Sequence, residues 1–517
     1  MSDTSANNKR IAKNTMFLYV RMLISMAVQL YTSRVILDVL GASDYGLYNV
    51  VGGMVTMFAF MSNTMSTAAQ RFMSYAIGKN DEDDLRNTFV TSNILLWGIA
   101  LIVLVLVETI GLWFLFNQLS IPEGRTSAAF WVFQFSVVSL AVTIVSVPYN
   151  AAIVAHEKMS AFAYLSLIDI FLKLAVAVLL TFLTGGADRL IVYGGLLMSI
   201  SILLRVLYTI YCKRHFVECS NNQYKYDKEK VSKMLSFFGW NTIGSLSYVA
   251  KEQGVNILIN IFFGTVVNAA RGVTSQVTGA VQGFISNFQL AMNPQITKYY
   301  AQGDYDNLFK LVQRGAKLSV FLYFFLALPL YLNLDFILNL WLVDVPNHTA
   351  SFIQLTMILM MIEALSSPVI TCLLAVGKVK WYQIIVGGLL ILNLPVSYIA
   401  LHWGCNPEIT IQIAIIISFV SLLVRLVMLN RYIGFPIQEF FTQVLLRALL
   451  VVVLSFCISM LIYNNTLLQG FSKLLLTGAA SWMISAIIIL YVGMSKSERN
   501  LVYNVIRKFG TKIGIMK

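Results

Sequence analysis

The chain has 517 residues, of which 58% are hydrophobic and 12% are charged, and its formal net charge at pH 7 is +13. In soluble domains about a quarter of all residues are charged, so this composition excludes an ordinary water-soluble protein. Apolar runs of about 20 residues, the length that spans a bilayer as a helix, recur from Ile11 to Met494. The alternating pattern of a membrane barrel is absent from the sequence. We therefore expect an all-α polytopic membrane protein.

The apolar runs predict about fourteen transmembrane helices. In chain order they cover roughly residues 11–37, 45–70, 89–116, 127–154, 160–184, 190–211, 235–262, 267–292, 315–333, 349–374, 382–401, 409–430, 443–463 and 470–494.

Basic residues gather in every second connector, as in "KNDEDDLRN", "CKRHFVECSNNQYKYDKEK" and the end of the chain. Because basic connectors stay in the cytoplasm, both termini are expected there. The positive net charge thus reflects membrane topology. The longest connector is too short to fold as a nucleic-acid-binding domain, so we expect no nucleic acid as a partner.

Residue types that bind metals or nucleotides show no useful spacing. The five cysteines form no CxxC pair, the four histidines are isolated near connectors, and no GxxxxGK[ST] loop occurs. The sequence therefore predicts no metal site, no cofactor and no ATP hydrolysis.

An internal repeat organises the chain. The motif Tyr-Ala-x-Gly occurs at Tyr75 to Gly78 and again at Tyr300 to Gly303, each time after a span rich in glycine and polar residues that follows Gly41 or Gly264. Both copies start on the same side of the membrane, which predicts two parallel six-helix lobes. The expected parts are lobes 1–211 and 232–430, a cytoplasmic linker 212–231, two further helices in 431–494, and a basic amphipathic tail 495–517 on the cytoplasmic leaflet.

This organisation resembles the multidrug, oligosaccharidyl-lipid and polysaccharide flippase (MOP) superfamily. The stretches "LGASDYGLYNVV" and "STAAQRFMSYAIGKND" are similar to the second-helix region of polysaccharide-repeat-unit flippases of the Wzx type. The resemblance implies a flippase, not an enzyme. Such a flippase carries an undecaprenyl-pyrophosphate-linked oligosaccharide from the inner to the outer leaflet of the bacterial inner membrane by alternating access. Its implied partners are this lipid-linked oligosaccharide, membrane lipids and other polysaccharide-assembly proteins.

Polar side chains form stripes on four of the expected spans. At 100° per residue, one line of the eighth span collects Arg271, Ser275, Thr278, Gln282, Gln289 and Asn293. The first, second and seventh spans carry similar faces. Contact between such polar faces and lipid is unfavourable, so we expect the faces to line a water-filled cavity. The candidate substrate-binding residues are Arg21, Arg271, Arg34, Lys251, Gln29, Asn49 and Gln282.

The arginines are the strongest candidates, because a guanidinium stays charged and binds phosphate oxygens with a two-pronged fork. Arg21 lies about 15 Å inside the first helix, too deep to reach the head groups easily. Arg34 lies near the outer end of that helix, where it could instead reach the head groups, so Arg21 and Arg271 rank above it.

Intramembrane acids suggest ion coupling. Glu252 and Glu363 have no obvious partner on their own helix, apart from Lys251 beside Glu252, and each could carry a coupling proton or sodium ion. Asp169 and Lys173 are spaced i, i+4 and are expected to form a structural ion pair.

Two other functions remain open. A cation-coupled multidrug antiporter of the same superfamily should present acids and aromatic rings to its ligand, whereas the stripes here carry arginines. A membrane-embedded polysaccharide ligase ranks last, because no outer connector is long enough to look catalytic.

Overall fold

The computed structural model describes residues 2–56, 59–117, 121, 124–182, 188–220, 227–342, 345–496 and 498–500, and these residues are almost entirely helical. The α-helices are α1 (Ser2–Thr56), α2 (Ala59–Gly78), α3 (Glu82–Leu106), α4 (Leu112–Asn117), α5 (Thr126–Ala155), α6 (Met159–Thr181), α7 (Arg189–His215), α8 (Lys228–Gln302), α9 (Tyr305–Leu332), α10 (Leu334–Trp341), α11 (Thr349–Val376), α12 (Val379–Tyr382), α13 (Gly388–Ile391), α14 (Asn393–His402), α15 (Ile409–Ile433), α16 (Ile437–Phe440), α17 (Leu446–Asn465) and α18 (Gly470–Ile488).

The sequence prediction of an all-α polytopic fold is confirmed. In the described part of the chain, eleven helices are long and apolar enough to cross a membrane. The expected spans 45–70, 235–262 and 267–292 fall on α1 with α2 and on α8, which carry many polar residues. The total of fourteen spans and their arrangement as two parallel lobes stay predictions.

The chain divides into two compact units. The first comprises Met1–Ser245 and Leu290–Tyr305, and the second comprises Leu246–Gln289 and Asp306–Lys517. Helix α8 therefore contributes its two ends to the first unit and its middle to the second.

The two longest helices each contain a turn. In α1, Gly41 has φ 74° and ψ 165°, a conformation that glycine adopts without the strain other residues would meet. In α8, the side chains of Glu252 and Arg271 approach to 3.6 Å, although a straight helix would hold these residues about 28 Å apart. Helix α8 must therefore turn back on itself between them, as expected for two successive spans.

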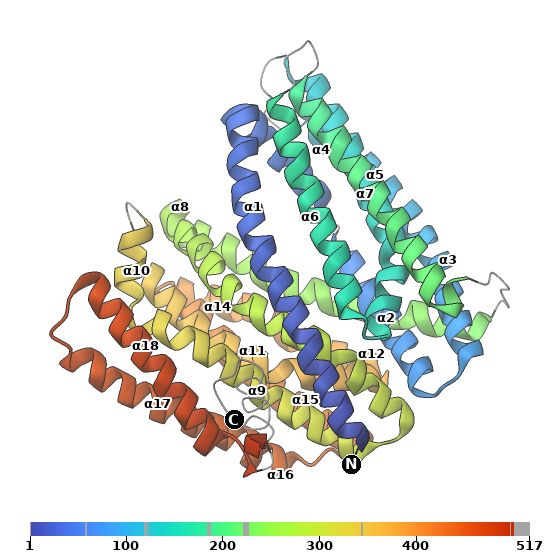
Figure 1. Ribbon diagram of the computed structural model, residues 1–517. Helices are drawn as coiled ribbons and strands as arrows, with labels where there is room; N and C mark the ends of the chain where they lie inside the picture. Colours follow the sequence, from blue (N-terminus) through green and yellow to red (C-terminus); the bar gives the residue numbers. More distant parts are fainter. Residues whose placement is uncertain are drawn as a thin grey trace, which may run out of the picture. The chain divides into compact units, whose positions relative to one another are not determined.

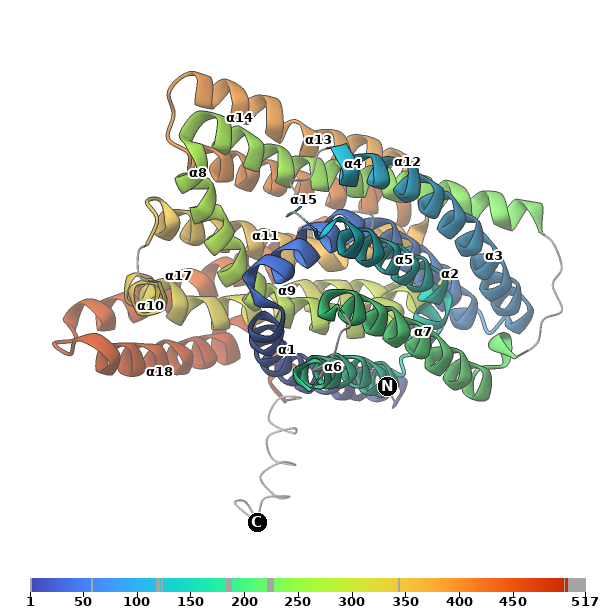
Figure 2. The ribbon, with the colours of Figure 1, turned by 90° about the horizontal axis from the view of Figure 1, so that it is seen from above.

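Within the first unit, α5 packs against α2, α3 and α7, and α6 packs against α1. Both ribbon views show α1 beside α6 (Figures 1 and 2). The core of this unit is apolar and includes the fully buried Leu96, Phe133 and Ile144. The pair Asp169–Lys173 on α6 is formed at 2.8 Å, which confirms that expectation.

The two copies of the Tyr-Ala-x-Gly motif touch each other in the first unit. The rings of Tyr75 and Tyr300 lie 6.3 Å apart between centroids. A Cβ atom on Gly78 would lie 2.8 Å from Cβ of Ala301 and 2.9 Å from backbone atoms of Lys298. Glycine at position 78 thus permits a close approach of the ends of α2 and α8.

Gly78→Ala is expected to lower the free energy of unfolding by about 1–3 kcal/mol, because the added methyl group meets backbone that cannot yield cheaply. The measurement is thermal unfolding of the purified protein in detergent. Gly98→Ala in α3 is the matched control, since nothing lies within 4 Å of the position of its Cβ atom. Equal melting temperatures for Gly78→Ala and the unaltered protein would contradict the close approach.

The turn between α5 and α6 has a counterpart between α11 and α12. Glu157 and Gly377 both have positive φ, 58° and 83°, and the lysine that follows each has φ near −80° and ψ 58°. The left-handed conformation is easy for glycine but costs another residue about 1–2 kcal/mol. Glu157 must therefore be held in place by its contacts.

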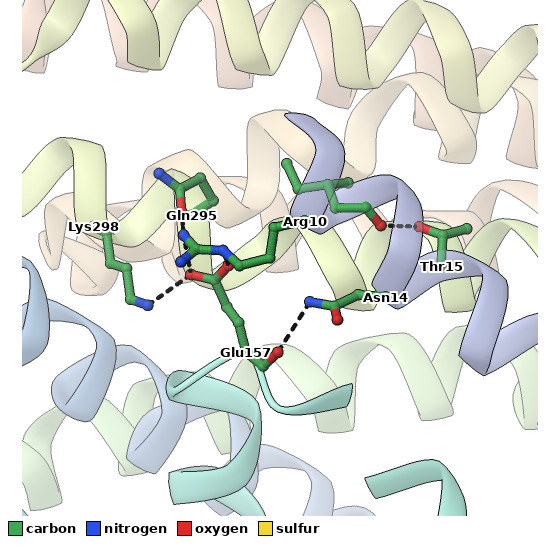
Figure 3. A network of polar contacts seen from close by, with 7 residues as sticks. Arg10, Asn14, Thr15, Glu157, Gln295 and Lys298 are labelled. Atoms are coloured by element: carbon green, nitrogen blue, oxygen red, sulfur yellow. Dashed lines mark hydrogen bonds and ion pairs between the residues drawn. The ribbon is translucent and has the colours of Figure 1, made fainter. Parts of the chain in front are cut away.

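Glu157 is the centre of a polar network in the first unit (Figure 3). Its buried carboxylate accepts a hydrogen bond from Nζ of Lys298 at 2.6 Å and pairs with Nε of Arg10 at 2.6 Å. Its backbone carbonyl accepts a hydrogen bond from Asn14 at 3.0 Å, and Arg10 also donates to Gln295. The network joins the start of α1, the α5–α6 turn and the end of α8.

In the second unit, α17 and α18 form a pair of adjacent helices (Figures 1 and 2). Side chains of α17 pack on Phe324, Leu328 and Leu332 of α9. Thr477 of α18 donates a hydrogen bond to Asn333, which directly follows α9. The segment after α18 is also anchored, because Glu498 pairs with Lys317 of α9 at 2.7 Å. Of the expected tail, residues 501–517 lie outside the described residues.

Glu498 should make stability depend on pH. Burial opposes ionisation, but hydrogen bonds from Lys317 and from the Ser495 backbone lower the pKa of this carboxyl below its ordinary value of 4.5. A carboxylate with a lowered pKa stabilises the fold above that ordinary value, and the contribution is lost as pH falls through the lowered pKa.

Glu498→Gln is therefore expected to melt below the unaltered protein at neutral pH, with the gap closing under acid conditions. The measurement is the melting temperature from about pH 7 to about pH 3. Glu229→Gln serves as the control, because that side chain is exposed. A gap that stays constant over this range would contradict the assignment.

Candidate substrate-binding site

A cavity of about 200 Å³ lies inside the second unit, among α8, α11, the start of α14 and the start of α15. Its lining residues are Lys251, Glu252, Val255, Arg271, Thr274, Ser275, Thr278, Gly279, Gln282, Thr356, Leu359, Met360, Asn393, Thr410, Ile411 and Ala414. Three of the candidate substrate-binding residues, Arg271, Lys251 and Gln282, thus lie together around one space, with the candidate coupling acid Glu252.

The turn in α8 builds the charged part of this cavity. It brings Arg271 back to Glu252, which shares its carboxylate between Arg271 at 3.6 Å and Lys251 at 3.4 Å. Lys251 is 2% exposed, and its ammonium lies 5.2 Å from the centre of the Tyr248 ring. Two cations face one carboxylate, so the cluster carries an excess of one positive charge.

The start of α14 contributes Asn393 to the cavity wall. Gly254 of α8 lies against Leu394, because a Cβ atom on that glycine would overlap Cδ2 of the leucine. Leu394 also packs with Val255 and Ile259 in one apolar cluster. Asn393 directly precedes Leu394, so it is held close to the part of α8 that carries Lys251 and Glu252.

Three threonines of the cavity wall use their hydroxyl hydrogens within the protein. Thr274 and Thr278 donate to backbone carbonyls one turn earlier in α8, both at 2.8 Å, and Thr410 donates to Pro407 at 2.9 Å. Their oxygens can therefore only accept further hydrogen bonds. Arg271 and Lys251 are the strong donors of this wall.

The other candidate residues lie elsewhere. Arg21, in the first unit, donates to Ser166 at 3.4 Å and lies 5.2 Å from the centre of the Phe162 ring. Gln29 is exposed. The side chains of Arg34 and Asn49 lie outside the part of the chain that the structure describes.

Glu363 does not line the cavity and instead accepts a hydrogen bond from Ser418 at 2.9 Å. Sequence reasoning did not single out Asn393 or Thr410. Asn393 stands alone in the apolar run "GGLLILNLPVSYIA", and an isolated amide in a membrane span is a signal that could have identified it.

Comparisons with known proteins agree with this architecture. The family model MatE matches residues 244–399. A search of curated proteins found no match in sequence. An outward-facing multidrug resistance MATE family transporter of the MOP superfamily is similar in structure, with a TM-score of 0.70 at 12% identity over 81% of this chain and 95% of that one.

Two further solved structures are similar. A MATE protein in complex with MaD3S has a TM-score of 0.66 at 13% identity, covering 82% of this chain and 97% of that one. A MOP superfamily transporter from Pyrococcus furiosus has a TM-score of 0.69 at 11% identity, covering 83% and 96%. These are structures of transporters rather than of enzymes. The chain therefore has the fold of the MATE transporters of the MOP superfamily, and its residues 244–399, which hold the charged cluster of the cavity, match the MatE family model.

Proposed function

We propose that this protein is a flippase that carries a lipid-pyrophosphate-linked oligosaccharide across the bacterial inner membrane by alternating access. The observation that carries the proposal is the excess positive charge of a cavity whose wall includes helices long and apolar enough to cross a membrane. Charges inside a membrane protein are costly and usually serve function. Here the two cations, Lys251 and Arg271, suit a pyrophosphate.

Binding would proceed by exchange of one anion for another. Without substrate, Glu252 neutralises part of the charge of Lys251 and Arg271. Phosphate oxygens would replace this carboxylate, with the guanidinium of Arg271 offering two parallel hydrogen bonds. The released Glu252 is then the group that would take up a coupling proton or sodium ion. Glu363, bound to Ser418, remains the second candidate for coupling.

The other parts of the proposal follow from the sequence. Arg21 and Arg34 are proposed to assist the pyrophosphate, and Gln29 and Asn49 to bind sugars. The lipid tail would stay in the bilayer, because a polar oligosaccharide cannot cross hydrocarbon but can cross a lined cavity. Both termini would be cytoplasmic.

A structure with a similar fold is compatible with an anionic substrate. The Pyrococcus furiosus transporter is described as having a binding pocket of reverse polarity that suggests a different function. One fold can thus carry pockets of different charge, and function must be argued from the site. The charged cluster of this cavity favours an anion over a cationic drug.

The second candidate, a cation-coupled multidrug antiporter, is favoured by the likeness to a multidrug transporter and by the single carboxylate in the cavity. One strain distinguishes the two functions: a bacterium that lacks its own polysaccharide flippase and is sensitive to cationic drugs. We expect the protein to restore surface polysaccharide and leave drug resistance unchanged. Raised resistance without polysaccharide would favour the antiporter.

A further inference from the structure

The size of the cavity limits what it can hold. Its volume of about 200 Å³ is below the roughly 300–1,000 Å³ of pockets that enclose drug-sized ligands. A whole oligosaccharide does not fit in such a space. One phosphate and the sugar ring directly attached to it are of the appropriate size, and this part of the inference rests on the proposed function.

Two amide oxygens in the cavity wall lack a donor. Oδ1 of Asn393 and Oε1 of Gln282 are buried, and neither has a hydrogen-bond partner among the described residues. Asn393 is 1% exposed. Buried acceptors are nearly always satisfied in folded proteins, because an unsatisfied one loses its hydrogen bonds to water without replacement. A ligand that donates hydrogen bonds would satisfy both.

The placement of these two amides differs. Asn393 precedes Leu394, which packs on Gly254 next to Lys251 and Glu252. Gln282 lies on the same face of α8 as Arg271 but about 16 Å farther along the helix. Asn393 is therefore the amide that can reach the sugar attached to a phosphate held by the two cations.

The remaining wall suits a sugar ring. Thr274, Thr278 and Thr410 offer only oxygen acceptors to this space, because their hydroxyl hydrogens are used within the protein. Val255, Leu359 and Ile411 present apolar surface to the same space. A ring with outward hydroxyl donors and C–H faces matches this mixture of acceptors and apolar groups.

We propose that this cavity is a subsite for a single sugar 1-phosphate group of the substrate, and that Asn393 determines which sugar is accepted. The cations hold the phosphate, and Oδ1 of Asn393 accepts a hydrogen bond from a hydroxyl group of the attached ring. Sugars that place no hydroxyl group at this oxygen leave it unsatisfied and bind more weakly.

The test uses the full-length protein in detergent and isothermal titration calorimetry. The probes are glucose 1-phosphate, galactose 1-phosphate and N-acetylglucosamine 1-phosphate, with inorganic phosphate as the reference. We expect at least one sugar phosphate to bind about tenfold more tightly than phosphate. Asn393→Leu, of similar size, should abolish this advantage and leave the affinity for phosphate within about twofold. Asn465→Leu, at an exposed site, should change neither affinity.

The subsite is overturned if no sugar phosphate binds more tightly than phosphate, or if the advantage survives in Asn393→Leu. Equal weakening of both ligands in this variant also overturns it, since Asn393 would then only shape the cavity. A second measurement uses the unaltered protein, so it does not depend on a variant folding correctly. One deoxy analogue of the preferred sugar phosphate should bind no more tightly than inorganic phosphate. Failure of the proposed function is a separate result: the protein would bind the sugar phosphate with the expected advantage but would not restore surface polysaccharide in the flippase-deficient strain.

Discussion

Arg271→Ala is expected to abolish polysaccharide export in a flippase-deficient cell while the protein stays in the membrane. Among the described residues of the cavity wall, Arg271 is the one arginine, so the substitution removes the fork-shaped cation and leaves Lys251 paired with Glu252. Hydrogen bonds to charged groups contribute about 1.5–3 kcal/mol, so affinity for pyrophosphate should fall by roughly 10- to 150-fold. Calorimetry with pyrophosphate and staining of surface polysaccharide measure the two effects.

Two variants make this experiment specific. Arg271→Lys should restore export only in part, because lysine keeps the charge but lacks the planar fork. Arg431→Ala, at an exposed position at the end of α15, should export normally. Normal export by Arg271→Ala at an unchanged membrane level would rule out a role for this guanidinium in substrate binding.

Glu157→Ala is expected to destabilise the first unit by roughly 3–5 kcal/mol, because removal of one partner leaves a buried charge without compensation. The Lys298 side chain is 11% exposed and would lose its carboxylate, as would Arg10. The measurement is unfolding in detergent, by heat or by denaturant. Glu82→Ala is the matched control, because the Glu82 carboxylate is exposed and lies 3.7 Å from Arg86.

A double substitution separates this effect from the cost of the unusual backbone. Glu157→Ala with Lys298→Met should lose less stability than the sum of the two single changes, because the second removes the charge that the first leaves unpaired. Glu157→Gly should be less damaging than Glu157→Ala by about 1–2 kcal/mol, since glycine tolerates the positive φ. Additive losses would show that the carboxylate and the ammonium do not act together.

Helical periodicity predicted which face of α8 is polar, but not how far along the helix that face lines the cavity. Arg271 and Gln282 share a line and line the cavity, whereas Gln289, which the same stripe includes, donates to Ser319 in the packed interior. The angle of a residue around a helix follows from its position in the sequence. Which neighbouring helix covers that angle depends on tertiary packing, and spacing along the chain does not reveal it.

The membrane spans were the easiest part to predict. The expected span 127–154 corresponds to α5, Thr126–Ala155, because a long apolar run has few other stable forms. The Glu157 network was not predicted. Its members Arg10, Glu157 and Lys298 are separated by more than 140 residues along the chain, and no periodicity connects them.

Transport in reconstituted vesicles tests the central claim most directly. A fluorescent oligosaccharide linked by pyrophosphate to a short isoprenoid is placed in vesicles that contain the purified protein, and an impermeant quencher reports which leaflet holds the glycan. We expect the unaltered protein to accelerate movement of this lipid between leaflets, and Arg271→Ala to leave it at the rate of protein-free vesicles. Equal rates with the unaltered protein and without protein, or equal acceleration of an ordinary fluorescent phospholipid, would contradict the account.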